Sequence, residues 1–142
     1  MPTAEPSHFF DLLRHGEPEG GDRFRGTRDD PLSETGWEQM RATVDGICPW
    51  DMIVSSPLKR CAAFAEELAQ RHQLPLEVEP QLREIAFGEW EGASYQEMRH
   101  KHLQAFLDFF RDPLNNTPPG GEPLVACQER VHKAWDHLLQ RH

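Results

Sequence analysis

Apolar and polar positions change period along this chain, and the changes predict alternating strands and helices. Short apolar runs predict strands at about 8–13, 51–55 and 76–79. Apolar residues at helical spacing predict helices over 34–46, 58–72, 94–111 and 123–141. Strands that alternate with helices form a parallel sheet covered by helices. The sequence therefore predicts one α/β domain, a three-layer sandwich with a mostly parallel sheet and helices on both faces.

Two of the predicted strands end in residues suited to an anion. The segment 13–17, Leu-Arg-His-Gly-Glu, places the guanidinium of Arg14 beside the imidazole of His15 where the first strand gives way to a loop. The segment 55–60, Ser-Ser-Pro-Leu-Lys-Arg, follows the second strand and begins a helix, whose free N–H groups and dipole favour negative charge. Ligands of parallel sheets bind at the carboxyl ends of the strands, so these segments and Arg60 predict a phosphate site.

A third segment, residues 82–92, adds a candidate acid. Glu84 precedes an aromatic and glycine-rich turn, Phe-Gly-Glu-Trp-Glu-Gly, at 87–92. Partial burial by Phe87 and Trp90 is expected to favour the protonated form of the Glu84 carboxyl.

Taken in this order, the three segments resemble the histidine phosphatase superfamily, the fold shared with cofactor-dependent phosphoglycerate mutase. The resemblance runs from Phe9 to Glu122 and includes residues 25–36. The turn at 87–92 and the later Gly-Gly-Glu at 120–122 look like the α-ribazole phosphatase and broad-specificity phosphatase branch. The mutase branch usually carries a longer insertion after its acid, and this chain has none, so the resemblance favours a phosphatase.

The resemblance implies a role for each residue of the site. His15 would be the nucleophile that takes the phosphoryl group as a phosphohistidine, and Arg14 and Arg60 would hold the phosphate oxygens. Glu84 would protonate the leaving alcohol and later deprotonate the attacking water. Fixed guanidinium forks suit the charge that phosphoryl transfer spreads over the non-bridging oxygens. No cofactor or metal is implied.

Two further residues, Arg25 and Glu122, are candidates for the site. Arg25 would add a phosphate contact, although the same loop also holds Arg23 and Arg28. Glu122 lies in a loop, 115–122, that borders the substrate in the resembling enzymes. It would help to select the substrate there, and the alternative is a solvated turn.

One element of the family pattern has no counterpart in the sequence. The family carries a second catalytic histidine in a His-Gly motif after a helix like the one expected at 123–141, and no His-Gly follows His15 here. His132, His137 and His142 lie on that helix and are expected to be solvated surface residues. We therefore expect a domain truncated at its C-terminal side, without the strand and helix that would complete the sheet and leave open strand edges.

Net charge and hydropathy limit the kinds of binding partner that this chain is expected to have. A net charge of −9 argues against a nucleic-acid partner, since a polyanion calls for a basic face. No stretch is long and apolar enough to span a membrane. The expected partner is a small phosphorylated metabolite, with a homodimer as a way to cover an open sheet edge.

The cysteines indicate no metal site. Cys48, Cys61 and Cys127 are odd in number and widely spaced, which fits a reduced, cytoplasmic setting. Cys61 follows Arg60 directly, so a nucleophilic thiol is an alternative to a buried inert one.

Two other functions stay open: a non-catalytic phosphate-binding module, and a mutase that depends on a bisphosphate primer.

Overall fold

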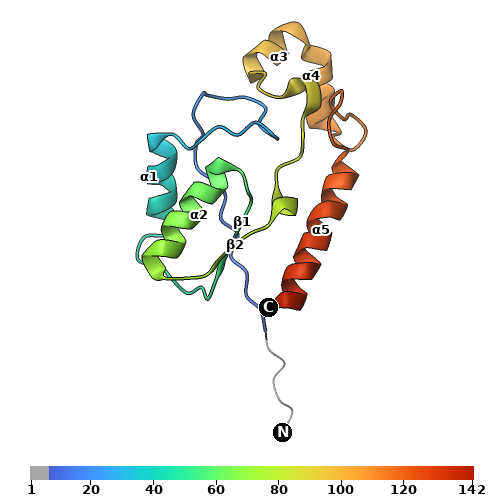
Figure 1. The fold of residues 1–142 in the computed structure, drawn as a ribbon. Coiled ribbons are helices and arrows are strands. Elements are labelled where there is room, and N and C mark those ends of the chain that lie inside the picture. The colour runs from blue at the N-terminus through green and yellow to red at the C-terminus, as the bar shows by residue number, and fades with distance from the viewer. Residues whose placement is uncertain (1–6) are drawn as a thin grey trace.

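The computed structural model describes residues 7–142, whose elements follow one another as helices around a small sheet (Figure 1). The α-helices are α1 (Glu34–Thr43), α2 (Lys59–His72), α3 (Tyr95–Lys101), α4 (Leu103–Arg111) and α5 (Leu124–Arg141). The strands are β1 (Ile53–Ser55) and β2 (Leu76–Val78), and short 3-10 turns are η1 (Pro80–Leu82) and η2 (Gly88–Trp90).

The sheet of the described residues is a parallel pair. Ile53 pairs with Leu76 and Ser55 pairs with Val78. Helix α2 makes the crossover between the two strands, as parallel neighbours require. In Figure 1, α1 and α2 lie on one side of the strands and α5 on the other. The α/β class expected from the sequence is confirmed.

The prediction of a strand at 8–13 is wrong. Residues 8–13 belong to no helix or strand, and no backbone hydrogen bond joins them to another described segment. A strand needs a hydrogen-bonded neighbour, whereas this segment is held by side chains: Trp50 Nε1 donates to Asp11 at 2.7 Å, and the Phe10 ring lies 4.2 Å from that of Trp135 on α5. Phe9 stays 92% exposed.

Two expected helices are shorter or divided. The helix expected at 34–46 ends at Thr43, and a turn follows in which Gly46 takes a positive φ of 68°. The helix expected at 94–111 is divided at His102, whose φ of −140° and ψ of 46° are not helical. After the break, Phe109 of α4 packs against Trp90 of η2, with ring centroids 5.6 Å apart.

Two clusters of buried side chains hold the fold. The first joins α1 and α2 through Leu32, Met40, Val44, Phe64 and Leu68, and Ile53 of β1 packs against it. The second surrounds Phe24 with the aromatic residues of η2, α3 and α4.

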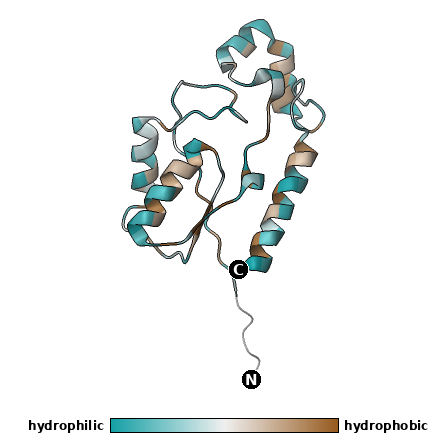
Figure 2. Ribbon diagram, in the orientation of Figure 1, coloured by the Kyte–Doolittle hydropathy of each residue, from teal (hydrophilic) through white to brown (hydrophobic). Residues whose placement is uncertain are grey.

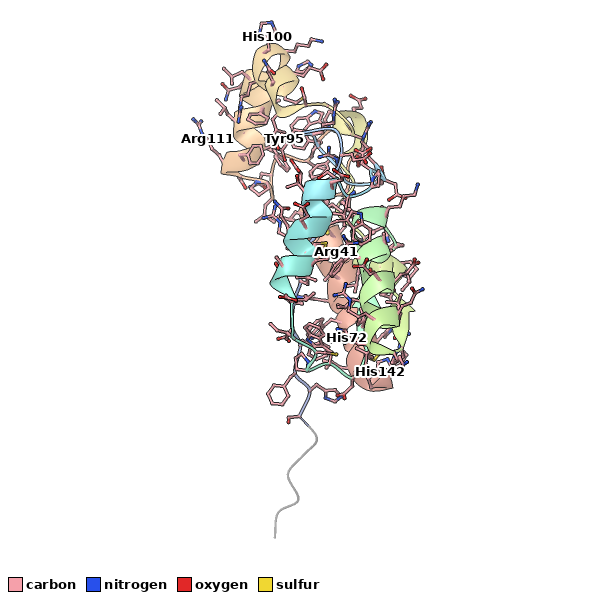
Figure 3. All side chains as sticks on the ribbon, turned by 90° about the vertical axis from the view of Figure 1, so that its left-hand side faces the viewer. Arg41, His72, Tyr95, His100, Arg111 and His142 are labelled. Atoms are coloured by element: carbon pink, nitrogen blue, oxygen red, sulfur yellow. The ribbon has the colours of Figure 1, made fainter. Side chains whose placement is uncertain are left out.

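Figure 2 shows the mixed hydropathy of the helices, and Figure 3 shows Tyr95, His100 and Arg111 at the α3–α4 end of the molecule and His142 near the other. Among the described residues, no helix has the length and apolar character needed to cross a membrane.

Candidate phosphate site

His15 is held in one tautomer by its own loop. Its Nδ1 lies 2.7 Å from the carbonyl oxygen of Gly16, and His15 is half-buried. A carbonyl oxygen only accepts, so Nδ1 donates and the lone pair of the neutral ring lies on Nε2. Arg14 is exposed, and its guanidinium forms no hydrogen bond or ion pair with the described residues. Both side chains are therefore available to a ligand.

The start of α1 fixes the loop that carries His15. A Cβ on Gly16 would overlap the carbonyl oxygen of Gly36, so the backbones touch where a side chain has no room. Ser33 caps α1 by accepting from the Gly36 N–H at 3.0 Å and donates to the Glu17 carboxylate at 2.9 Å. The glycine of the Arg-His-Gly segment is thus needed for packing against the helix.

Arg60 is buried, with 2% of its surface exposed, and its side chain binds the backbone of a loop. Its guanidinium donates to the carbonyl oxygens of Arg28 at 2.8 Å, Arg25 at 3.1 Å and Gly26 at 3.3 Å. No carboxylate forms an ion pair with Arg60 within residues 7–142. Carbonyl dipoles solvate the charge without neutralising it, so a buried cation remains beside this loop.

Arg25 is occupied within its loop. It donates to Asp30 at 2.8 Å and to the carbonyl oxygens of Glu19 and Gly21 at 2.7 and 2.6 Å. Burial by itself would raise the pKa of the Asp30 carboxyl, but hydrogen bonds from Arg28 and Arg25 lower it overall. Arg23 donates to Gly20 and Gly92, so the arginines of this loop all have structural partners.

The first turn of α2 has protein partners for some of its N–H groups. Lys59 donates its backbone N–H to Asp29 at 2.7 Å, and the Leu58 N–H lies 3.3 Å from the Ser56 hydroxyl. Asp29 thus stands where a ligand was expected to meet the helix dipole. The anion site predicted at this helix start is filled in part by a carboxylate of the chain itself.

Glu84 is exposed, and its carboxylate accepts from the Ile85 N–H at 2.8 Å. The burial expected from Phe87 and Trp90 is absent because both rings pack around Phe24 instead, with centroids 5.2 and 5.4 Å from its ring. The acid is left open to a ligand, without an apolar cover.

Glu91 was not singled out from the sequence, yet its carboxylate has four backbone N–H donors in the structure. Its carboxylate accepts backbone N–H groups from Gly26 at 3.0 Å, Thr27 at 2.6 Å, Arg28 at 3.4 Å and Phe87 at 3.2 Å. A glutamate in a turn carries no local signal for such contacts, because the loop it binds lies more than 60 residues away.

Glu122 has a partner that the sequence analysis also missed. Arg130 of α5 grips its carboxylate with bonds of 2.6 and 3.0 Å and donates to the carbonyl oxygens of Gln81 and Arg83 at 2.6 and 2.9 Å. The hydrogen bond from Arg130 holds the pKa of the Glu122 carboxyl below its usual value. Arg130 thereby joins Glu122 to the segment that leads into Glu84.

The remaining candidates lie in unremarkable surroundings. Burial raises the pKa of the Cys61 thiol and that of the Cys127 thiol, which disfavours the nucleophilic thiolate. His132 and His137 are exposed on α5, and His142 lies 3.0 Å from Glu77. No group of three or more metal-ligating side chains occurs among residues 7–142.

The chain is similar to several phosphatases. It is 32% identical to phosphoserine phosphatase 1 of Hydrogenobacter thermophilus over 92% of its own length and 64% of that protein. It is 29% identical to the adenosylcobalamin/alpha-ribazole phosphatase of Salmonella typhimurium over 89% of its length and 65% of that enzyme. The chain thus spans a little under two thirds of these relatives.

The fold is similar as well. The mycobacterial glucosyl-3-phosphoglycerate phosphatase in complex with VO3 superposes with a TM-score of 0.81 and 32% identity, covering 92% of this chain and 64% of that one. Residues 10–142 match the histidine phosphatase superfamily (branch 1), almost the whole range over which the fold is described. With both the sequence and the fold in agreement, the chain belongs to the histidine phosphatase superfamily.

Proposed function

We propose that this protein hydrolyses phosphate monoesters of small metabolites through a phosphohistidine on His15. The observation that carries the proposal is the buried guanidinium of Arg60, which has three carbonyl partners and no carboxylate among the described residues. The carbonyl dipoles solvate this charge without neutralising it, so it attracts an anion, and the oxygens of a phosphate group suit a guanidinium.

His15 has the tautomer that the reaction needs. The lone pair of Nε2 attacks phosphorus, and the bond from phosphorus to the ester oxygen breaks as Glu84 gives its proton to the leaving alcohol. Water then attacks the phosphohistidine, Glu84 takes a proton from that water, and the bond from phosphorus to Nε2 breaks to release phosphate. Arg14 and Arg60 stabilise the charge on the non-bridging oxygens in both steps.

The names of the relatives support a small phosphorylated substrate without choosing one. Phosphoserine, α-ribazole phosphate and glucosyl-3-phosphoglycerate differ in the alcohol, so what these phosphatases share is the phosphate ester. The exposed Glu84 is consistent with an acid that reaches the leaving oxygen of different alcohols.

One experiment tests the proposal directly. Hydrolysis of an aryl phosphate near pH 6, without added metal, is measured for the parent chain, for His15→Ala and for His132→Ala. Loss of a covalent nucleophile should lower turnover by orders of magnitude, whereas the exposed His132 on α5 should leave it unchanged. Equal turnover in the parent and His15→Ala would show that the nucleophile is wrong.

A second candidate function is phosphate binding without turnover. The exposed guanidinium of Arg14, which has no hydrogen-bond or ion-pair partner among residues 7–142, supports this alternative, because it can hold a phosphate whether or not an ester is cleaved. Under this alternative the parent binds inorganic phosphate, Arg14→Met weakens that binding, and no alcohol is released from the aryl ester.

A further inference from the structure

The loop 25–28 is held through its backbone by two side chains of opposite charge. Arg60 donates to the carbonyl oxygens of Arg25, Gly26 and Arg28, and Glu91 accepts the N–H groups of Gly26, Thr27 and Arg28. The same Glu91 carboxylate also accepts the N–H of Phe87, three residues after Glu84. One carboxylate therefore ties the arginine loop to the segment that carries the candidate acid.

The backbones at this junction meet without side chains between them. A Cβ on Gly26 would overlap both the carbonyl oxygen of Ile85 and the Glu91 carboxylate. Phe24 donates its N–H to the Ala93 carbonyl oxygen at 2.9 Å, and its own carbonyl oxygen accepts the N–H of Gly92 at 2.9 Å. These bonds extend the contact along both segments of the chain. The loop and the turn are thus in contact over several residues, with Glu91 at the centre.

The Glu91 carboxylate is set up to be ionised. Burial by itself would raise its pKa, but the N–H groups of Gly26, Thr27, Phe87 and Arg28 lower it overall. Hydrogen bonds to an ionised acceptor are about twice as strong as those between neutral groups, so a neutral side chain of the same shape would hold the loop less firmly.

From this geometry we infer that Glu91 is a positioning residue of the phosphate site: it fixes loop 25–28, which Arg60 binds, against the Glu84 segment, so that Arg60 and the acid keep one spacing. The inference rests on the proposed function for its catalytic consequence. The loop itself and the four N–H contacts stand independently of any reaction.

The matched pair of variants is Glu91→Gln and Glu89→Gln. Glu89 lies in the same turn, is exposed, and its carboxylate forms no hydrogen bond with the described residues. Amide hydrogen exchange on the unliganded protein is measured first. In Glu91→Gln the exchange of the Gly26 and Thr27 amides should accelerate at least about tenfold, while that of Ile53 in the sheet stays unchanged. Glu89→Gln should match the parent throughout.

The kinetic measurement separates positioning from a general loss of structure. In Glu91→Gln the KM for an aryl phosphate and the inhibition constant for inorganic phosphate should both rise about 10- to 100-fold, because the phosphate-binding groups lose their alignment. A smaller folded fraction would instead lower kcat and leave both constants unchanged, and that result would overturn the inference.

A measurement on the parent covers the case in which Glu91→Gln does not fold. The amide resonances of Gly26, Thr27 and Phe87 should shift together in one titration that lies below the ordinary range of a glutamate. Separate titrations, or unchanged exchange in a folded Glu91→Gln, would overturn the inference whatever the activity. A parent without turnover or phosphate binding would overturn the proposed function and the catalytic half of this inference, and the exchange result would still decide the structural half.

Discussion

Arg130 and Glu122 form a two-bond ion pair, with nitrogen to oxygen distances of 2.6 and 3.0 Å and side chains that are 8% and 18% exposed. The same guanidinium donates to the backbone of Gln81 and Arg83. Helix α5 is thereby attached to the segment just before Glu84, so its side chains help to place the candidate acid.

Loss of this pair should destabilise the fold. We expect Arg130→Met to lower the free energy of unfolding by about 2–3 kcal/mol, because Glu122 and two backbone carbonyls lose a charged donor. Arg141→Met is the control, since Arg141 is exposed and its pairs with Glu77 and Glu79 contribute under about 1 kcal/mol. Urea unfolding measures both variants, and equal midpoints would contradict the prediction.

The pair should also give the stability a dependence on pH. The folded-state pKa of Glu122 lies below its ordinary value of 4.5, so its contribution is complete above that value and is lost as pH falls through the lowered folded pKa. The difference in unfolding free energy between the parent and Arg130→Met should thus be constant from pH 7 to about 5 and shrink toward pH 3. A difference that persists undiminished at pH 3 would exclude the carboxylate as its source.

The contact between the histidine loop and α1 should not tolerate a side chain. Gly16→Ala places a Cβ on the carbonyl oxygen of Gly36, so we expect loss of aryl phosphate turnover and a lower melting temperature. Gly46→Ala meets no atom within 4 Å, and its positive φ costs only about 1–2 kcal/mol. Turnover in Gly16→Ala equal to that in Gly46→Ala would show that the loop can move away without cost.

Arg14 and Arg60 should separate binding from stability. Arg14 is exposed, so Arg14→Met should weaken phosphate binding and change the unfolding free energy by no more than about 0.5 kcal/mol. Arg60→Met should lower both, because loop 25–28 loses three hydrogen bonds. Phosphate titration and urea unfolding test the pair, and a fully stable Arg60→Met would contradict the structural half of the role assigned to Arg60.

The amino-acid sequence alone was enough to predict the family, the α/β class and helices α2 and α5, and to select His15, Arg60 and Glu84 as candidate site residues. Periodicity and short motifs are local properties, and they can be read along the chain. The same local pattern predicted a strand at 8–13. Residues 8–13 have no hydrogen-bonded backbone neighbour among the described residues. Strand pairing depends on which segment lies alongside in space, and a local pattern does not contain that information.

The contacts that hold the candidate residues could be found only in the folded chain. Arg25 forms an ion pair with Asp30, and Glu122 forms one with Arg130. Glu91 binds a loop more than 60 residues away in the sequence. A charged side chain takes whichever partner the fold brings within hydrogen-bonding distance, and such long-range contacts leave no periodic pattern in the sequence.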